Sequence, residues 1–154
     1  MSDPMFEIDL APSFVEPIGL NDGRLLGLER QSMAKMESSD GGRTWRGAGE
    51  LVDREGRPIA GDEPRRAYIM NLVRLNSGGI GLKFEVQQLG STGNLTRLDA
   101  FISKSLDEGG TWSAPVPITP PDAPTNATWL VRTSNGTLVL PNEYWFAQPG
   151  NGKH

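Results

Sequence analysis

The chain has 154 residues, of which 36% are hydrophobic and 22% charged, and its formal net charge is −4. This composition predicts a soluble globular domain with its own core, and because the basic residues form no dense cluster, nucleic acid is not expected as a partner. No run of about 18 apolar residues occurs, so neither a transmembrane helix nor a membrane partner is expected.

Cysteine and histidine counts exclude further kinds of site. The chain has no cysteine, so we expect neither a disulfide framework nor thiol catalysis. Its only histidine is the last residue, His154, which argues against a zinc site or a Ser-His-Asp triad within one copy. We expect no metal and no cofactor, since the sequence has no motif for either. Residues 1–11 do not read as a secretory signal, which leaves the location open between cytoplasmic and, if a signal was removed, secreted.

Three segments in chain order share one pattern: an apolar run, a turn rich in Asn, Asp, Ser and Gly, and a second apolar run. They are residues 14–28, 68–86 and 128–144, and each is predicted to form a β-hairpin because such turns supply positive φ. The turn glycines Gly23, Gly78 and Gly136 are spaced by 55 (78 − 23) and 58 (136 − 78) residues. No segment has the 3.6-residue apolar period of a helix.

Each of the first two hairpins is followed by a third apolar stretch, an eight-residue motif and a fourth stretch. The third stretches are residues 32–37 and 99–104, and the fourth are residues 48–52 and 115–118. Four-stranded units at this period predict propeller blades. We place a first blade at about 12–53, a second at about 66–119 and a half blade at about 126–147, with loops at 53–66 and 120–125. A sandwich or small barrel is the alternative, but it would not need a motif at the third turn of each unit.

The repeated motif is Ser-x-Asp-x-Gly-x-Thr-Trp. The aspartate can accept hydrogen bonds from backbone N–H groups of the turn, and the Ser and Thr hydroxyls can form hydrogen bonds with neighbouring backbone. The glycine permits positive φ, and the tryptophan can pack between sheets. These features predict a structural turn rather than a reactive group. The motif residues are Ser38, Asp40, Gly42, Thr44 and Trp45 in the first copy, and Ser105, Asp107, Gly109, Thr111 and Trp112 in the second.

The two motifs are similar to the Asp box of the sialidase (neuraminidase) superfamily, and the chain resembles the BNR-repeat domains of that family over nearly its whole length. The resemblance implies an all-β, six-bladed β-propeller, of which this chain holds about two and a half blades. It also implies a glycan site at the centre of one face, with the Asp boxes on turns remote from it. The competing hypothesis, that Asp40 and Asp107 form a catalytic carboxylate pair, is disfavoured.

The resemblance also implies a catalytic set, which consists of a Tyr nucleophile with a Glu partner, an Asp acid/base, and three arginines that bind the substrate carboxylate. The first of these arginines opens an inner strand in the family. The aligned positions in this chain are Tyr68, Asn126 and Ser13, and none is arginine. The complete catalytic set is therefore absent from this stretch.

Six residues are the remaining catalytic candidates. Arg65 and Arg66 precede the inner strand of the second unit, where a propeller loop can face the channel mouth. Glu143 and Tyr144 end a strand of the third unit, and Asp62 is a loop acid/base candidate together with Glu63. For each of them the alternative is a solvated loop residue or a packing residue.

The sequence thus predicts a sialidase-like domain that acts on glycans, as a partial or divergent exo-glycosidase of sialic-acid-type glycosides. The alternatives are a non-catalytic propeller module that binds carbohydrate or protein, and an inactive truncated fragment. The expected partner is a glycan or small sugar ligand. Because two and a half blades cannot close a ring, we also expect either a fragment of a longer protein or a homo-oligomer formed through exposed blade edges.

Overall fold

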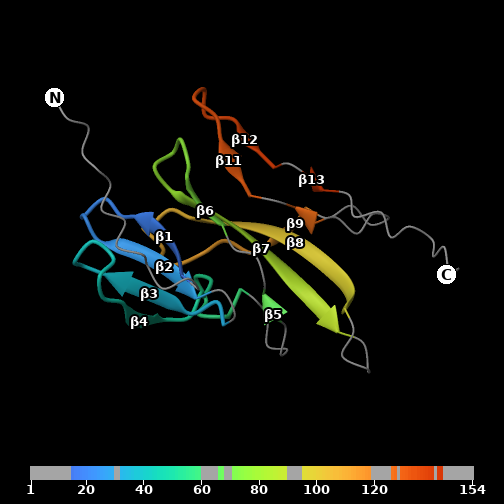
Figure 1. Ribbon diagram of the computed structural model, residues 1–154, viewed down its shortest axis with the longest axis horizontal. Coiled ribbons are helices and arrows are strands. Elements are labelled where there is room, and N and C mark those ends of the chain that lie inside the picture. Colours follow the sequence, from blue (N-terminus) through green and yellow to red (C-terminus); the bar gives the residue numbers. More distant parts are fainter. Residues whose placement is uncertain are drawn as a thin grey trace, which may run out of the picture.

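The computed structural model describes residues 15–29, 32–59, 66–67, 71–89, 95–118, 126–127, 129–140 and 142–143. These residues form thirteen β-strands, and every pairing between the strands is antiparallel (Figure 1). They contain no helix, and so none that is long and apolar enough to cross a membrane. The all-β class predicted from the sequence is therefore confirmed.

The first sheet contains four strands that pair in chain order: β1 (Val15–Gly19), β2 (Leu25–Glu29), β3 (Lys35–Ser38) and β4 (Arg46–Gly49). The turn between β1 and β2 is closed by the Leu20 N–H, which donates to Arg24 O at 2.8 Å, and by the Gly23 N–H, which donates to Leu20 O at 3.1 Å. Gly23 has a φ of 86°, a conformation that glycine adopts without steric cost. The first sequence motif lies between β3 and β4, as expected.

The second sheet consists of β5 (Arg66–Ala67), β6 (Asn71–Arg74), β7 (Ile80–Leu89), β8 (Leu95–Ser105) and β9 (Val116–Pro117). Strands β5 and β6 both pair with β7 and together form an interrupted inner strand. From Ala67 to Asn71 the inner strand advances four residues (71 − 67), while its partners on β7 advance three (86 − 83). The two registers on β7 therefore differ by one residue.

The third hairpin comprises β10 (Asn126–Ala127), β11 (Val131–Arg132), β12 (Leu138–Val139) and β13 (Asn142–Glu143), in which β10 pairs with β13 and β11 with β12. Its turn repeats the earlier ones, since the Thr133 N–H donates to Thr137 O and the Gly136 N–H donates to Thr133 O, both at 2.9 Å. The register difference of one residue recurs here, because Ala127 and Val131 are four residues apart while their partners Asn142 and Val139 are three apart.

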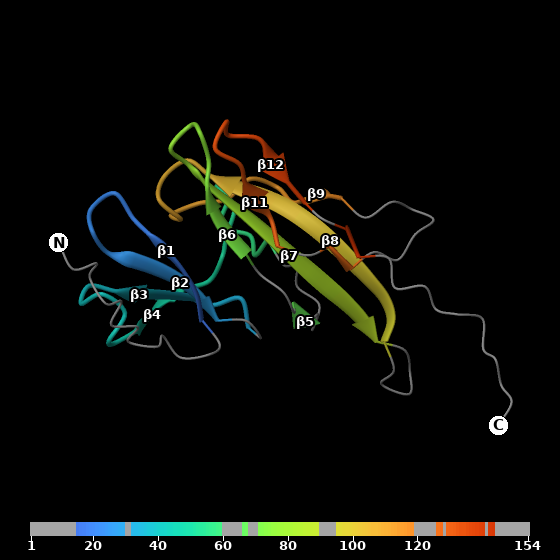
Figure 2. The same cartoon turned by 45° about the horizontal axis from the view of Figure 1, so that its top comes forward.

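The second sheet lies between the first sheet and the third hairpin (Figures 1 and 2), and β6 is in contact with both β1 and β11. The core joins the first two sheets, and the rings of Phe84 and Phe101 stack with their centroids 5.4 Å apart. Burial of these side chains is the main source of stability in such a fold. The buried members of the core are Leu20, Leu26, Leu28, Met33, Leu51, Ile59, Leu72, Ile80, Leu82, Phe84, Val86 and Trp112.

Two strand boundaries differ from the sequence-based expectation. Strand β8 begins at Leu95, before the predicted start at residue 99, because the backbone ladder with β7 continues beyond the apolar run. The predicted loop after β4 also contains structure, since Val52 bridges to Pro58 and Asp53 forms a parallel bridge with Trp112. This bridge joins the segment that leaves the first sheet to the second motif.

Candidate functional site

The first copy of the repeated motif (residues 38–45), here called the first Asp box after the motif it resembles, is closed by hydrogen bonds that converge on Ser38 and Asp40. The Ser38 hydroxyl donates to Asp40 Oδ1 at 2.7 Å and accepts from the Gly42 N–H at 2.9 Å. The other end of the turn is held by Thr44, whose backbone N–H donates to Asp40 Oδ1 at 3.0 Å and whose hydroxyl donates to Oδ2 at 2.6 Å. Both carboxylate oxygens of Asp40 are thus engaged within their own turn.

The second Asp box repeats this pattern. The Ser105 hydroxyl donates to Asp107 Oδ1 at 2.7 Å and accepts from the Gly109 N–H at 2.8 Å. Thr111 donates its backbone N–H to Asp107 Oδ1 at 2.9 Å and its hydroxyl to Oδ2 at 2.8 Å. The same residue types at the same spacing therefore produce the same turn twice, between β3 and β4 in the first sheet and between β8 and β9 in the second.

These hydrogen bonds fix the ionisation of both aspartates. Donation by the Thr44 hydroxyl and backbone N–H, and by the Ser38 hydroxyl, lowers the pKa of Asp40 far below its usual range. Burial alone would raise the pKa of Asp107, but the donors of Thr111 and Ser105 outweigh it and leave that pKa lowered. An ionised carboxylate whose oxygens hold a turn is unsuited to proton donation near neutral pH, which agrees with a structural task for both boxes.

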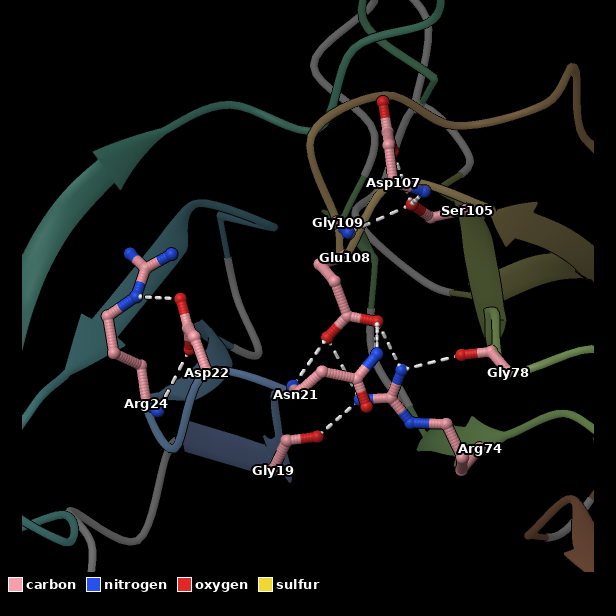
Figure 3. A network of polar contacts seen from close by, with 10 residues as sticks. All are labelled: Gly19, Asn21, Asp22, Arg24, Arg74, Gly78, Ser105, Asp107, Glu108 and Gly109. Atoms are coloured by element: carbon pink, nitrogen blue, oxygen red, sulfur yellow. Dashed lines mark hydrogen bonds and ion pairs between the residues drawn. The ribbon is translucent and has the colours of Figure 1, made fainter.

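Glu108 extends the second box toward the first sheet (Figure 3). Its Oε1 lies 2.5 Å from Arg74 Nη1, and its Oε2 lies 2.9 Å from the backbone N of Asn21 in the turn between β1 and β2. The hydrogen bond from Arg74 lowers the pKa of Glu108, although burial opposes the shift. Sequence reasoning missed this residue. Its signal was that the other box has Gly41 at the same position, where φ is positive in both boxes (57° at Glu108 and 77° at Gly41).

An arginine contact between consecutive units recurs along the chain. Arg74 Nη2 donates to the carbonyl of Gly19 in the first sheet, and Arg132 Nη1 donates to the carbonyl of Arg74 at 3.4 Å. Gly19, Arg74 and Arg132 are equivalent in the repeat, since 19 + 55 = 74 and 74 + 58 = 132. Each unit therefore binds the preceding one at the same backbone position.

The two box tryptophans differ in their surroundings. Trp45 is half-buried, and its Nε1 donates to Gly42 O at 2.9 Å. Trp112 is 2% exposed and its backbone N–H donates to Val52 O at 3.0 Å, so the segment leaving the first sheet covers it. Within the described part of the chain the Trp112 Nε1 has no partner, and Lys35 Nζ donates to the equivalent carbonyl of Gly109 at 3.4 Å.

A cavity of about 430 Å³ lies between the second Asp box and the turn at residues 53–57. Arg57 in this turn pairs with Asp53 at 2.7 Å and with Glu55 at 2.9 Å. The carboxylates that line the cavity, which are those of Asp53, Glu55 and Asp107, are therefore already paired or hydrogen-bonded. This arrangement provides no spare carboxylate for acid–base chemistry. The lining residues are Asp53, Arg54, Glu55, Arg57, Lys104, Leu106, Asp107, Thr111, Trp112, Ser113 and Ala114.

A buried polar cluster lies on the face of β7 that points away from the first sheet. Lys83 and Glu85 are 0% and 1% exposed and form an ion pair with each other. Burial lowers the pKa of Lys83 and raises that of Glu85, while their mutual hydrogen bond and attraction oppose both shifts. Among the described residues, Glu85 Oε2 and Asn71 Oδ1 have no hydrogen-bond partner. The sequence analysis did not single out this cluster.

Most of the catalytic candidates are not among the described residues. Asp62, Glu63, Arg65 and Tyr144 lie outside the described residues. Arg66 is in β5, opposite Gln87, and Glu143 is in β13, opposite Asn126. Because Glu143 is 58 residues after Glu85, it occupies the same position in the repeat.

Arg66 and the second Asp box lie at opposite ends of the second sheet. Ile80, opposite Ser105, and Gln87, opposite Arg66, are seven residues apart on β7 (87 − 80). At roughly 3.3 Å per residue this separation is about 23 Å. The described residues also contain no group of three or more His, Cys, Asp or Glu side chains placed to hold a metal ion.

No protein-family model matches the sequence, and no curated protein matches it. Among solved structures, the chain is similar to the Hadza microbial sialidase Hz136, with a TM-score of 0.52 and 17% sequence identity. The match covers 82% of this chain and 31% of that chain, so the chain spans about a third of the length of the sialidase. At this identity the likeness concerns the fold alone. The chain has a sialidase-like fold and forms part of a β-propeller.

Proposed function

We propose that the chain is part of an Asp-box (BNR-repeat) propeller of the sialidase superfamily that acts on glycans, as part of an exo-glycosidase of sialic-acid-type glycosides. One observation carries the proposal. The Asp box recurs with the same hydrogen bonds at the same turn of two consecutive sheets. It does so in a chain whose fold is similar to that of a microbial sialidase.

The sugar site belongs, in this proposal, at the end of the sheets opposite the Asp boxes. Arg66 opens the inner strand of the second sheet at that end, and Arg65 precedes it in the sequence. A guanidinium can bind the carboxylate of a sialic acid through two parallel hydrogen bonds, which suits these arginines to substrate binding. Glu143, Tyr144 and Asp62 are the proposed sources of the nucleophile pair and the acid/base.

A fluorogenic sialoside assay tests this function. We expect hydrolysis by the complete propeller of which this chain is a part, with a loss of at least about tenfold in kcat/KM when Arg65 and Arg66 are both replaced by alanine, because each bidentate contact contributes to substrate binding. Arg54→Ala is the matched control, since Arg54 is an exposed arginine at the Asp-box end. Absence of turnover at high enzyme concentration would rule out the catalytic proposal for this chain.

A second candidate function is a glycan-binding module without catalysis. It is favoured by the residues Tyr68, Asn126 and Ser13, which stand where the resemblance calls for an arginine. Saturation-transfer NMR with sialic acid distinguishes the two functions. Binding that depends on Arg65 and Arg66 but is accompanied by no hydrolysis supports the module, and turnover supports the enzyme.

A further inference from the structure

The carboxylate of Glu108 lies in a site that consists of four hydrogen-bond donors from two units (Figure 3). Asn21, in the turn of the first sheet, donates its backbone N–H to Oε2 at 2.9 Å and its side-chain amide to Oε1 at 3.0 Å. Arg74, in the second sheet, donates from Nη1 to Oε1 at 2.5 Å and from Nη2 to Oε2 at 3.2 Å. A guanidinium that binds both oxygens of a carboxylate forms a strong and directional contact.

The turn that carries Asn21 recurs in the second sheet, where Asn76 stands 55 residues later (76 − 21) at the same position. This turn is closed by the Leu75 N–H, which donates to Gly79 O at 2.8 Å, and by the Gly78 N–H, which donates to Leu75 O at 3.0 Å. The same two hydrogen bonds close the turn between β1 and β2. The backbone N–H of Asn76 is therefore directed toward the third unit as that of Asn21 is directed toward the second.

The arginine of the site recurs in the third unit. Arg132 stands 58 residues after Arg74 (132 − 74), and its Nη1 donates to the carbonyl of Arg74 at 3.4 Å, as Arg74 Nη2 donates to the carbonyl of Gly19. The side-chain amide of Asn76 lies at the same interface, since its Nδ2 donates one of its two N–H groups to Gly136 O at 3.3 Å. Both side chains are exposed, and no carboxylate among the described residues pairs with Arg132.

The arginine and the glutamate of this site are present together in the second unit and absent together from the first. The second unit has Arg74 and, directly after the aspartate of its Asp box, Glu108, whereas the first has Gly19 and Gly41 at these positions. The φ at the box position is positive in both units, which costs a glycine little but requires compensating contacts for a glutamate. Because the third unit has the arginine, the repeat predicts an acidic residue in its Asp box.

We propose that Arg132 and Asn76 form a second carboxylate-binding site, and that its occupant is the residue directly after the aspartate in the Asp box of the third unit. Residues 144–154 contain no Asp box, so this residue belongs to the rest of the propeller. We expect glutamate, because Glu108 has the length that joins a box to a turn at the first site. The proposal rests on the β-propeller fold and on stability, so a protein that hydrolyses no glycan leaves it unaffected.

The gene sequence of the complete propeller is the first test. The repeat places the third Asp box about 58 residues after the second, with the pattern Ser-x-Asp-Glu at its start. A box with glutamate or aspartate at the fourth position supports the proposal. A neutral or basic residue there, or a third unit without an Asp box, overturns it.

Denaturant unfolding of the complete propeller tests the contact itself. Arg132→Met should lower the folding equilibrium constant about tenfold or more, as Arg74→Met should, because each removes hydrogen bonds from a guanidinium to a carboxylate. Arg54→Met is the matched control, since Arg54 is exposed and forms no ion pair among the described residues. It should change the constant by no more than about twofold.

A double-mutant cycle separates the proposed pair from a general loss of packing. Replacement of the acidic residue of the third box by its neutral amide should weaken folding in the natural background and add little in the Arg132→Met background. The coupling should resemble that between Arg74 and Glu108 measured in the same way. Additive losses at Arg132 and the box residue overturn the proposal, and so does an Arg132→Met variant as stable as Arg54→Met.

Discussion

The carboxylate of Glu108 accepts two hydrogen bonds from Asn21, one from the backbone N–H at 2.9 Å and one from the side-chain amide at 3.0 Å, although 87 residues separate the two in sequence. Glu108 holds a φ of 57°, which is unfavourable for a residue with a Cβ. Such a conformation persists only where contacts compensate for it. The Asn21 and Arg74 contacts supply this compensation and tie the second Asp box to the first sheet.

The first prediction concerns the charge of this contact. Glu108→Gln keeps the shape of the side chain but removes its charge, so the hydrogen bonds from Arg74 and Asn21 weaken. We expect the free energy of unfolding to fall by about 1–2 kcal/mol, measured by urea denaturation. Glu50→Gln is the control, because Glu50 is exposed and no contact is described for it. A Glu108→Gln variant as stable as the control would contradict the proposal that the Glu108 carboxylate links the two sheets.

The second prediction compares equivalent glycines of the two boxes. A Cβ on Gly109 would lie 2.5 Å from Leu26 Cδ2, whereas a Cβ on Gly42 would lie 3.4 Å from Leu25 Cδ1. Both glycines have positive φ, at 85° and 94°, so alanine at either costs about 1–2 kcal/mol of backbone strain. Gly109→Ala should cost about 1–3 kcal/mol more, because Leu26 is buried and cannot move aside freely. Thermal unfolding of the two variants measures the difference, and equal losses would mean that the sheets are not closely packed there.

The third prediction concerns the buried ion pair. Glu85→Leu removes the carboxylate that pairs with the buried Lys83, and we expect the free energy of unfolding to fall by about 3–5 kcal/mol. The double variant Lys83→Met with Glu85→Leu removes both charges and should lose clearly less than the single variant. A double-mutant cycle in denaturant measures this coupling. Additive losses would show that the two side chains do not stabilise one another.

The fourth prediction is a loss of stability in acid. The pKa values of Asp40, Asp107 and Glu108 are lowered from ordinary values of 3.8, 3.8 and 4.5, so their contribution is complete above these values. It is lost as the pH falls from there through the lower pKa values of the folded state. Denaturant titrations from neutral pH downward should show this decline. Asp40→Asn and Asp107→Asn should each flatten it, and an unchanged slope in both variants would mean that other groups dominate acid unfolding.

The sequence predicted the strands and turns because their signals are local. Turn glycines at Gly23, Gly78 and Gly136 and the spacing within each Asp box depend on residues a few positions apart, and the structure has these turns where the pattern placed them. The buried pair Lys83 and Glu85 could not be read in the same way. Charged residues that alternate with apolar ones in a strand usually mark its exposed face. Only the packing of the whole sheet shows that Lys83 and Glu85 are buried.

The candidate site was less predictable than the fold for a related reason. The contact between Glu108 and Asn21 depends on how one sheet lies beside the next, and no periodicity within either segment contains that information. In the sequence this contact is visible only as a departure from the repeat, since Glu108 stands in the second Asp box where the first has Gly41. The proposed sugar site depends on Arg65, Arg66, Glu143, Tyr144 and Asp62, which come from separate segments that only the closed arrangement of blades would bring together.

The arginine contacts between successive units have a consequence for how such chains grow by gene duplication. Arg74 binds the carbonyl of Gly19, and Arg132 binds the carbonyl of Arg74. In both contacts the acceptor is main chain, so it is present whatever side chain occupies that position, and the second and third units each contribute only the arginine donor. A duplicated copy of either unit keeps this donor and meets a main-chain acceptor in its predecessor, so repeats can be gained without first evolving a matching partner.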